Sequence, residues 1–275
     1  MRFVQKHRQL LLVVILSVVT FLFLLPLIWA FLTSLKLHRD VFTFPPKWIF
    51  TPTIENYLYV LRETDYLKFM SNSIVISFSS AAMSVFLGAL AAFGLSRFRV
   101  KGSKTILMWI LSLRMIPPIA IVVPFYLMAI RIGLYDTRSG LAIVLLAINV
   151  PIAVWLQMSY IREIPKAIEE SAMLEGCSPI GAFFRVVLPL EATGLFATFI
   201  MCLIFSWNEF PLTMILTGNV SKTLPVSMLS WDTQRGLQWG NMMAASMMAI
   251  APILIFTALA QKYLVRGLTL GSVVD

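Results

Sequence analysis

Six long apolar runs divide this chain and limit the environment in which it can fold. A helix needs about 20 consecutive apolar residues to cross the hydrocarbon core of a membrane. Charged residues make up 13% of the chain, whereas soluble domains carry about 25%. We therefore expect an all-α integral membrane protein, because lipid cannot satisfy the polar backbone of an open strand. The expected spans are residues 10–32, 72–95, 105–129, 141–160, 193–217 and 241–263.

The first apolar run follows a short basic leader, as the core of a secretory signal peptide would. Its apolar stretch is too long for a signal core, and no small-residue cleavage site follows it. We therefore interpret residues 10–32 as a retained first span.

Lysine and arginine in the loops indicate the orientation of the chain. The short segment 98–104, FRVKGSK, follows Arg97 and is dense in positive charge. Short positive loops stay on the cytoplasmic side, so we expect both termini and the 161–190 loop to be cytoplasmic. These loop residues also account for the net charge of +9, and no basic helix with interleaved aromatics indicates nucleic-acid binding.

The sequence contains no recognisable catalytic motif. Cys177 and Cys202 lack metal-type spacing, and His7 and His38 lie outside the spans. A P-loop, a GxSxG elbow and a dinucleotide fingerprint are all absent from the sequence. We expect no catalytic residue, metal ligand or bound cofactor, and any ATP would be hydrolysed by another chain.

A charged segment lies between the fourth and fifth spans, in the loop 161–190. Residues 169–189 read EESAMLEGCSPIGAFFRVVLP. Pro165 suits the first turn of a helix, which we expect to run to residue 175 and to end at Gly176 with positive φ. On this helix Ile168 and Leu174 would share an apolar face, while Glu169 and Glu170 would face water and a partner.

A second helix is expected directly after this turn. Ser178 can cap its N-terminus and Pro179 can occupy its first position. It would cover residues 180–188 and end at Pro189. The residues alone leave two interpretations open: a surface connector between two spans, or an amphipathic element that docks into the groove of a partner.

Several polar residues fall inside the expected spans. Arg114 precedes Pro117 and Pro118, which should break the third helix. A charge in the membrane is costly, so Arg114 either lines a path or forms a structural ion pair, with Glu209 as the possible partner. Asn149 either lines the path or caps its own backbone. The remaining candidates for the path are Trp207, Asn208 and Glu209, which could instead form interhelical hydrogen bonds.

The charged loop resembles the EAA loop of the membrane subunits of ATP-binding-cassette (ABC) importers. That pattern is E-A-A, three residues, G, nine residues and I-x-L-P. Here Ser171 stands in place of alanine at the second position of E-A-A, Val186 replaces isoleucine, and Glu175 replaces a common aspartate, while the spacing is kept. The matching positions are Glu170, Ser171, Ala172, Gly176, Val186, Leu188 and Pro189.

The resemblance extends to PPKWIFTPTIENY, SLRMIPP, SWNEFPL and the tail RGLTLGSVVD. These segments are similar to the smaller permease subunit of carbohydrate-type, maltose-transporter-like ABC importers. The resemblance implies the type I importer permease fold, with six spans in a bacterial or archaeal cytoplasmic membrane, and a carbohydrate-like substrate. The EAA helix, acting as a coupling helix, would dock on the ATPase, and the tail would also contact it. The tail positions that match are Gly267, Leu268, Thr269 and Gly271.

The same resemblance implies a set of partners. They are a second permease subunit, two copies of an ATPase that uses ATP and Mg²⁺, an external substrate-binding protein and membrane lipid. The alternative is an ion-gradient-driven secondary carrier. A carrier would favour intramembrane carboxylates and repeat symmetry, whereas this chain offers Glu209 and no clear repeat.

Overall fold

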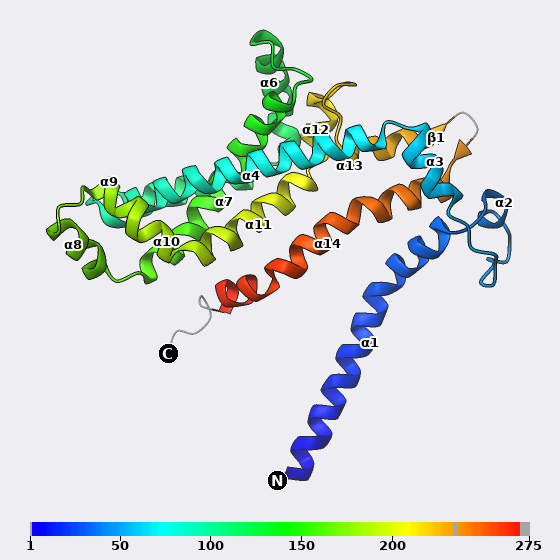
Figure 1. The fold of residues 1–275 in the computed structure, drawn as a ribbon, viewed down its shortest axis with the longest axis horizontal. Coiled ribbons are helices and arrows are strands. Elements are labelled where there is room, and N and C mark those ends of the chain that lie inside the picture. Colours follow the sequence, from blue (N-terminus) through cyan, green and yellow to red (C-terminus); the bar gives the residue numbers. More distant parts are fainter. Residues whose placement is uncertain (1, 234–235, 270–275) are drawn as a thin grey trace. The chain divides into compact units, whose positions relative to one another are not determined.

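The structure is a computed structural model that describes residues 2–233 and 236–269. It divides into two compact units, and helices α4 (Tyr66–Arg97) and α14 (Trp239–Thr269) contribute to both. Unit 1 comprises Met1–Leu67 and Met228–Ala251, and unit 2 comprises Lys68–Ser227 and Pro252–Asp275. Figure 1 shows that the described chain is almost entirely helical, in agreement with the all-α expectation.

In unit 1, hydrogen bonds join the C-terminal end of helix α1 (Arg2–Ser34) to the short helix α3 (Glu55–Glu63). The Asn56 amide donates to the carbonyls of Ser34 and Lys36 at 2.8 Å each. The Tyr66 hydroxyl donates to the Ala245 carbonyl at 3.1 Å, which joins α4 to α14. The other elements of the unit are α2 (His38–Val41), the 3₁₀ turn η3 (Met228–Trp231), β1 (Asp232–Thr233) and β2 (Gly236–Leu237).

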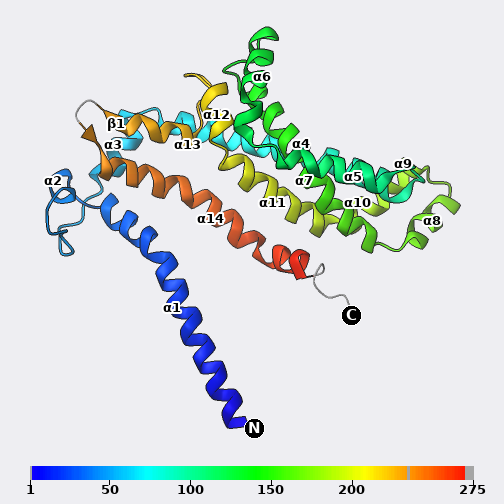
Figure 2. The same cartoon turned by 180° about the vertical axis from the view of Figure 1, so that it is seen from behind.

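Unit 2 has a core of three helices, α4, α7 (Arg138–Glu163) and α11 (Ala192–Trp207), which lie side by side in both views (Figures 1 and 2). A Cβ added at Gly88 would lie 2.7 Å from the Cβ of Ala153, so α4 and α7 approach closely there. The other elements are α5 (Ser103–Ser112), η1 (Leu113–Met115), α6 (Pro118–Arg131), α8 (Lys166–Leu174), α9 (Pro179–Ala182), the π-helix η2 (Phe183–Val187), α10 (Leu188–Leu190), α12 (Pro211–Leu216) and α13 (Leu224–Ser227).

Helices α7 and α11 are antiparallel, and two contacts fix their register. The Asn149 side-chain amide donates to the Ser206 hydroxyl at 2.7 Å. Further along, Gly194 packs directly against Tyr160, because an added Cβ would lie 2.4 Å from the Tyr160 ring. Residue 149 is therefore level with residue 206, and residue 160 with residue 194.

Within residues 2–233 and 236–269, four helices are long and apolar enough to cross a membrane, or six spans if each of two bent pairs counts as one. The first bent pair is Ser103–Met115 with Pro118–Arg131, which meet at 91°. It corresponds to the expected third span, and it confirms that Pro117 and Pro118 break that helix. The second pair is Pro179–Leu190 with Ala192–Trp207, which meet at 78°.

The expectation of one continuous helix over residues 193–217 is wrong. Helix α11 ends at Trp207, and a separate helix, α12, begins at Pro211. Pro211 has no N–H to offer the carbonyl four residues before it, so the α-helical ladder cannot continue. The Asn208 side chain turns back and donates to the Ile204 carbonyl at 2.9 Å.

The expectation that Pro189 ends the second loop helix is also wrong. The helical run continues through Pro189 to Leu190. The preceding π-helix changes the hydrogen-bond ladder, because the Leu188 N–H donates to the Phe183 carbonyl five residues back. The chain breaks instead at Glu191, immediately before α11.

Asp136 organises the loop that precedes α7. Its carboxylate accepts hydrogen bonds from the backbone N–H groups of Gly218 at 2.8 Å, Ser221 at 2.9 Å and Val220 at 3.1 Å, and from the Ser221 hydroxyl at 2.8 Å. Burial raises the pKa of Asp136, but the hydrogen bonds from Ser221, Val220 and Gly218 oppose this and hold it below its ordinary value. The ionised carboxylate therefore stabilises the folded loop.

Replacing Asp136 by asparagine should destabilise unit 2. The substitution replaces charge-assisted hydrogen bonds by neutral ones, which should lower the free energy of unfolding by about 1–2 kcal/mol. The folded pKa lies below the unfolded one, so this stabilisation is complete above about pH 4 and is lost as pH falls through the folded pKa. Thermal unfolding of the purified protein in detergent at pH 7 measures the effect. Asp65→Asn, at an exposed aspartate, is the control, and equal melting temperatures for the two variants would contradict this role.

Candidate functional site

The predicted helical hairpin between the fourth and fifth spans is present, and we call residues 166–190 the hairpin. Helix α8 ends in a Schellman turn. The Cys177 N–H donates to the Ala172 carbonyl at 3.0 Å, and the Gly176 N–H donates to the Met173 carbonyl at 3.1 Å. Gly176 has φ +95°, which confirms the predicted C-terminal glycine. The Ser178 hydroxyl then accepts from the Gly181 N–H at 3.1 Å, which confirms the predicted cap of the second helix.

The expected orientation of α8 is wrong for Glu169. This side chain is buried, with 5% of the residue exposed, and it lies against the end of α4 rather than in water. Leu174, which was expected to share the apolar inner face, is 90% exposed, and Ile168 is also exposed. A buried arginine from α4 determines this orientation, because the carboxylate of Glu169 neutralises it.

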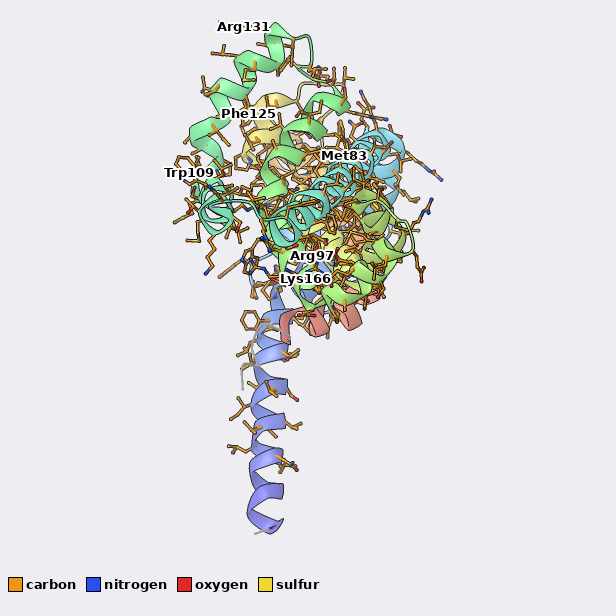
Figure 3. The ribbon with its side chains drawn as sticks, turned by 90° about the vertical axis from the view of Figure 1, so that its left-hand side faces the viewer. Met83, Arg97, Trp109, Phe125, Arg131 and Lys166 are labelled. Carbon is orange, nitrogen blue, oxygen red and sulfur yellow. The ribbon has the colours of Figure 1, made fainter. Side chains whose placement is uncertain are left out.

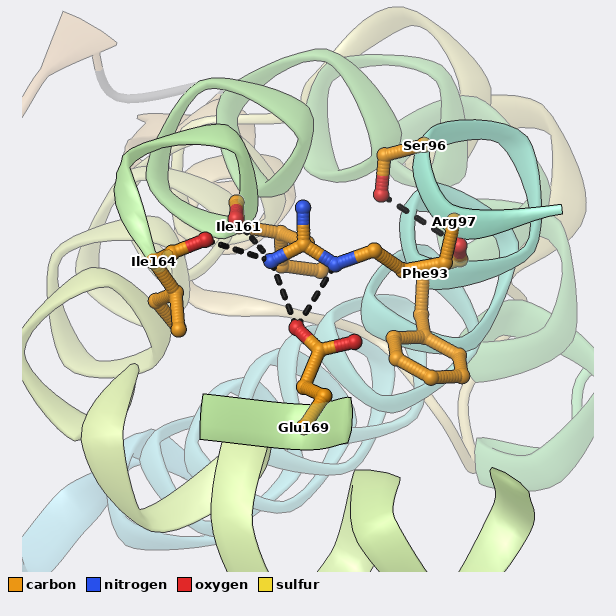
Figure 4. Close-up of polar contacts among 6 residues, drawn as sticks. All are labelled: Phe93, Ser96, Arg97, Ile161, Ile164 and Glu169. Atoms are coloured by element: carbon orange, nitrogen blue, oxygen red, sulfur yellow. Dashed lines mark hydrogen bonds and ion pairs between the residues drawn. The ribbon is translucent and has the colours of Figure 1, made fainter. Parts of the chain in front are cut away.

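That arginine is Arg97, the last residue of α4 (Figure 4). Its Nε donates to Glu169 Oε1 at 2.6 Å, and its Nη2 donates to the carbonyls of Ile161 and Ile164 at 2.8 Å each. These carbonyls belong to the end of α7, where a helix leaves its last carbonyls without internal partners. The ion-paired side chains of Arg97 and Glu169 are 8% and 6% exposed. The sequence indicates Arg97 only as a loop charge, although a cation at a helix C-terminus is a common stabilising feature that could have pointed to this contact.

The residues of the EAA-like pattern lie on the outside of the hairpin or along its flank. Ser171 Oγ donates to the Ala167 carbonyl at 2.8 Å, so the departure from alanine is satisfied within α8. Glu170, Ser171, Gly176 and Pro189 are exposed, and Ala172, Val186 and Leu188 are partly buried. The hairpin therefore presents an exposed surface that includes Ile168, Glu170, Ser171 and Leu174.

A second cluster of polar side chains surrounds Arg114, just before the break between α5 and α6. The guanidinium carbon lies 4.5 Å from the centre of the Phe205 ring, and Nη1 donates to the Ile148 carbonyl at 3.2 Å. Two cavities, of about 470 and 360 Å³, are lined by Arg114 and Glu209 together. The smaller cavity is also lined by Asn149 and Asn208.

Arg114 and Glu209 do not form the ion pair that the sequence left open. Among the described residues the ion pairs are Lys47–Asp40 and Arg97–Glu169. Glu209 Oε1 instead accepts from the Leu212 N–H at 3.1 Å, at the start of α12. The Arg114 guanidinium therefore forms no ion pair with Glu209 or with any other carboxylate among the described residues.

Asn149 and Trp207 are both buried, with 2% and 4% of each residue exposed. The Asn149 amide binds the Ser206 hydroxyl and the Cys202 carbonyl of α11, so it bridges two helices rather than capping its own backbone. Trp207 does not line either cavity among the described residues. The tail positions Gly267, Leu268 and Thr269 form the last turn of α14, and Gly271 lies outside the described residues.

Comparison with known proteins gives a consistent result. Residues 84–270 match the family described as "Binding-protein-dependent transport system inner membrane component". A probable ABC transporter permease protein of Sinorhizobium fredii is 38% identical over 266 residues, which cover 97% of this chain and 96% of that relative. The trehalose/maltose transport system permease protein MalG of Thermococcus litoralis is 32% identical over 253 residues, which cover 90% and 91%.

A solved structure shares the fold. It is the crystal structure of a bacterial ABC transporter involved in the import of the acidic polysaccharide alginate. One of its chains matches with a TM-score of 0.79 and 22% sequence identity, over 94% of this chain and 96% of that chain. At this identity the likeness establishes the fold of the helices described above.

The geometry around Arg114 predicts that Arg114 and Glu209 contribute independently to stability. Arg114→Gln should destabilise the protein by loss of the Phe205 stacking, and Glu209→Gln should destabilise it by replacing the charge-assisted hydrogen bond to the Leu212 N–H with a weaker neutral one. Their double variant should show the sum of the two losses to within about 0.5 kcal/mol. Unfolding in detergent of the wild type, both single variants and the double variant measures the coupling. A coupling energy well above 1 kcal/mol would show that the two charges do pair.

Proposed function

The chain belongs to the family of inner-membrane components of binding-protein-dependent transport systems, and we propose that it is a carbohydrate permease of an ABC importer. It forms half of the path for a sugar, polyol or related solute and carries no ATPase activity of its own. Family membership excludes the ion-driven secondary carrier. The relative from Thermococcus litoralis, named for trehalose and maltose, supports a carbohydrate as the class of solute.

The observation that carries this proposal is the hairpin. Its caps make α8 a rigid element, and its outer face exposes apolar side chains to water: Leu174 is 90% exposed and Ile168 is 43% exposed. An apolar, water-facing knob on a membrane protein fits a groove on a soluble partner. We assign that partner as the ATPase subunit, with Glu170 and Gly176 at the centre of the coupling surface.

We propose six spans for this chain, formed by α1, α4, α5 with α6, α7, α11 with α12, and α14. Of the second bent pair, only Ala192–Trp207 then crosses the membrane, and Pro179–Leu190 belongs to the hairpin. Both termini and the hairpin then lie on the cytoplasmic side of the inner membrane. The assembly contains a second permease subunit, two ATPase copies that use ATP and Mg²⁺, and an external substrate-binding protein. The tail from Gly267 to Gly271 contributes a further contact with the ATPase.

The cavities around Arg114 are proposed as part of the translocation path. A sugar offers hydroxyl groups to hydrogen-bonding side chains and an apolar ring face to aromatic or aliphatic ones. The smaller cavity combines Asn208, Glu209 and Arg114 with the ring of Phe205, which is this mixture of groups. Asn149 also lines it, whereas Trp207 is buried and does not line it.

Transport then follows from rigid-body coupling. ATP binding closes the ATPase dimer and carries the docked hairpins with it. The spans attached to each hairpin rock together, and the path switches from one side of the membrane to the other. This chain provides the docking hairpin and the moving spans, and the partner subunit hydrolyses ATP.

Replacing Gly176 by valine should uncouple the importer. Valine at φ +95° is strained by about 1–2 kcal/mol, which distorts the turn that presents α8. ATP-driven uptake by the complete importer in proteoliposomes should fall by about fivefold or more. The solutes tested are radiolabelled maltose, trehalose and polyols that the binding protein retains.

Gly94→Val is the matched control for this experiment. Gly94 lies in α4, and a Cβ added there meets no atom within 4 Å. Uptake by the Gly94 variant should remain close to the wild type. Wild-type uptake by the Gly176 variant would contradict the role of the hairpin, and failure of the wild-type complex to take up any solute on addition of ATP would contradict the proposed function.

A further inference from the structure

Arg97 holds three elements of unit 2 together through one guanidinium group. It ends α4, it binds two carbonyls at the end of α7, and it pairs with Glu169 on α8. Arg97 and Lys166, at the start of α8, lie close together in Figure 3, and both line the same cavity. The hairpin is therefore fixed to two spans by a buried ion pair, in addition to the short link between α7 and α8.

There is space beside this ion pair. A cavity of about 130 Å³ lies between the hairpin and the end of α4. Arg97, Glu169 and Phe93 line it, together with Pro179 and Ala182 from the second half of the hairpin. The ion pair consequently borders free volume into which side chains can rearrange.

A second carboxyl group is buried nearby without a partner. Glu191 lies at the break between α10 and α11, and 3% of the residue is exposed. Neither of its carboxyl oxygens has a hydrogen-bond partner among the described residues. A buried carboxyl without donors is costly, so its presence at this position needs an explanation.

The register of α7 and α11 places Glu191 next to the Arg97 site. Residue 149 is level with residue 206, and residue 160 with residue 194. Continuing the antiparallel pairing brings Glu191 level with residues 163 and 164, and the Ile164 carbonyl is one of the groups that Arg97 binds. Burial raises the pKa of Glu191 to about 8, and the positive charge of Arg97 opposes this shift.

We propose that Arg97 is a positioning residue with two carboxylate partners, Glu169 in the conformation described here and Glu191 when the hairpin moves. This rests on the proposed function, because the motion is the one that the ATPase imposes on α8. A buried arginine that lost Glu169 would otherwise remain as an unpaired charge, which is strongly unfavourable. Glu191 supplies the replacement, so α8 can shift while α4 and α7 stay attached to Arg97.

Uptake per ATP hydrolysed by the complete importer in proteoliposomes tests this exchange. The Glu169→Gln and Glu191→Gln variants should each lower that ratio by about fivefold or more, while the complex still assembles on gel filtration. The double variant should be no worse than the more affected single variant, because both carboxylates act through Arg97. Glu163→Gln, at an exposed glutamate near the end of α7, is the charge-matched control and should match the wild type.

Wild-type coupling in the Glu191 variant would overturn the proposal, since a merely buried carboxyl would have no part in transport. Additive losses in the double variant would overturn it as well, because the two carboxylates would then act separately.

Amide hydrogen-exchange rates of the complex test the two partners of Arg97 independently of the proposed function. Without nucleotide, Glu169→Gln should speed exchange of the α8 amides and Glu191→Gln should not. With a non-hydrolysable ATP analogue, Glu191→Gln should speed exchange at the end of α7. Absence of ATP-driven uptake by the wild type would contradict the proposed function, whereas unchanged exchange in both nucleotide states would contradict the two partners of Arg97.

Discussion

A polar group inside a lipid bilayer has to find its partner within the protein, and the helix breaks of unit 2 follow this constraint. Where α5 and α6 separate, Arg114 reaches a carbonyl of α7. Where α11 stops, the Asn208 side chain binds the Ile204 carbonyl and Glu209 caps α12. The break at Glu191 is the exception, because its carboxyl has no hydrogen-bond partner in the part of the chain that the structure describes. At the other two breaks, polar side chains bind backbone groups close to the interruption.

The sequence predicted local features well, because they depend on neighbouring residues. The turn at Gly176, the cap at Ser178 and the break at Pro117 each follow from the backbone preferences of those residues. The burial of Glu169 could not be predicted in this way. Its partner, Arg97, is 72 residues away along the chain, and the pattern of α8 alone favours the opposite face. The helix continues through Pro189 because of the π-helix that precedes it, and no residue pattern predicts that π-helix.

The site around Arg114 shows how the same rule shapes a cavity. The guanidinium is held by a ring and a carbonyl, Glu209 is held by an N–H of α12, and Asn149 is held by α11. Each polar group keeps some capacity for further hydrogen bonds while its position is fixed. The sequence identified these residues by their polarity. The sequence could not show that Asn208 and Glu209 line the cavity while Trp207 does not, because this difference depends on how α7 and α11 face each other.

The exposure of Leu174 has a consequence for the biogenesis of the protein. In the isolated chain this side chain is 90% exposed at the end of α8 in the hairpin. Docking on a partner would cover it, so an orphan subunit differs from an assembled one by an accessible apolar residue. Chaperones and proteases that recognise such residues could then distinguish the two, and the supply of the partner would set how many copies of this chain survive.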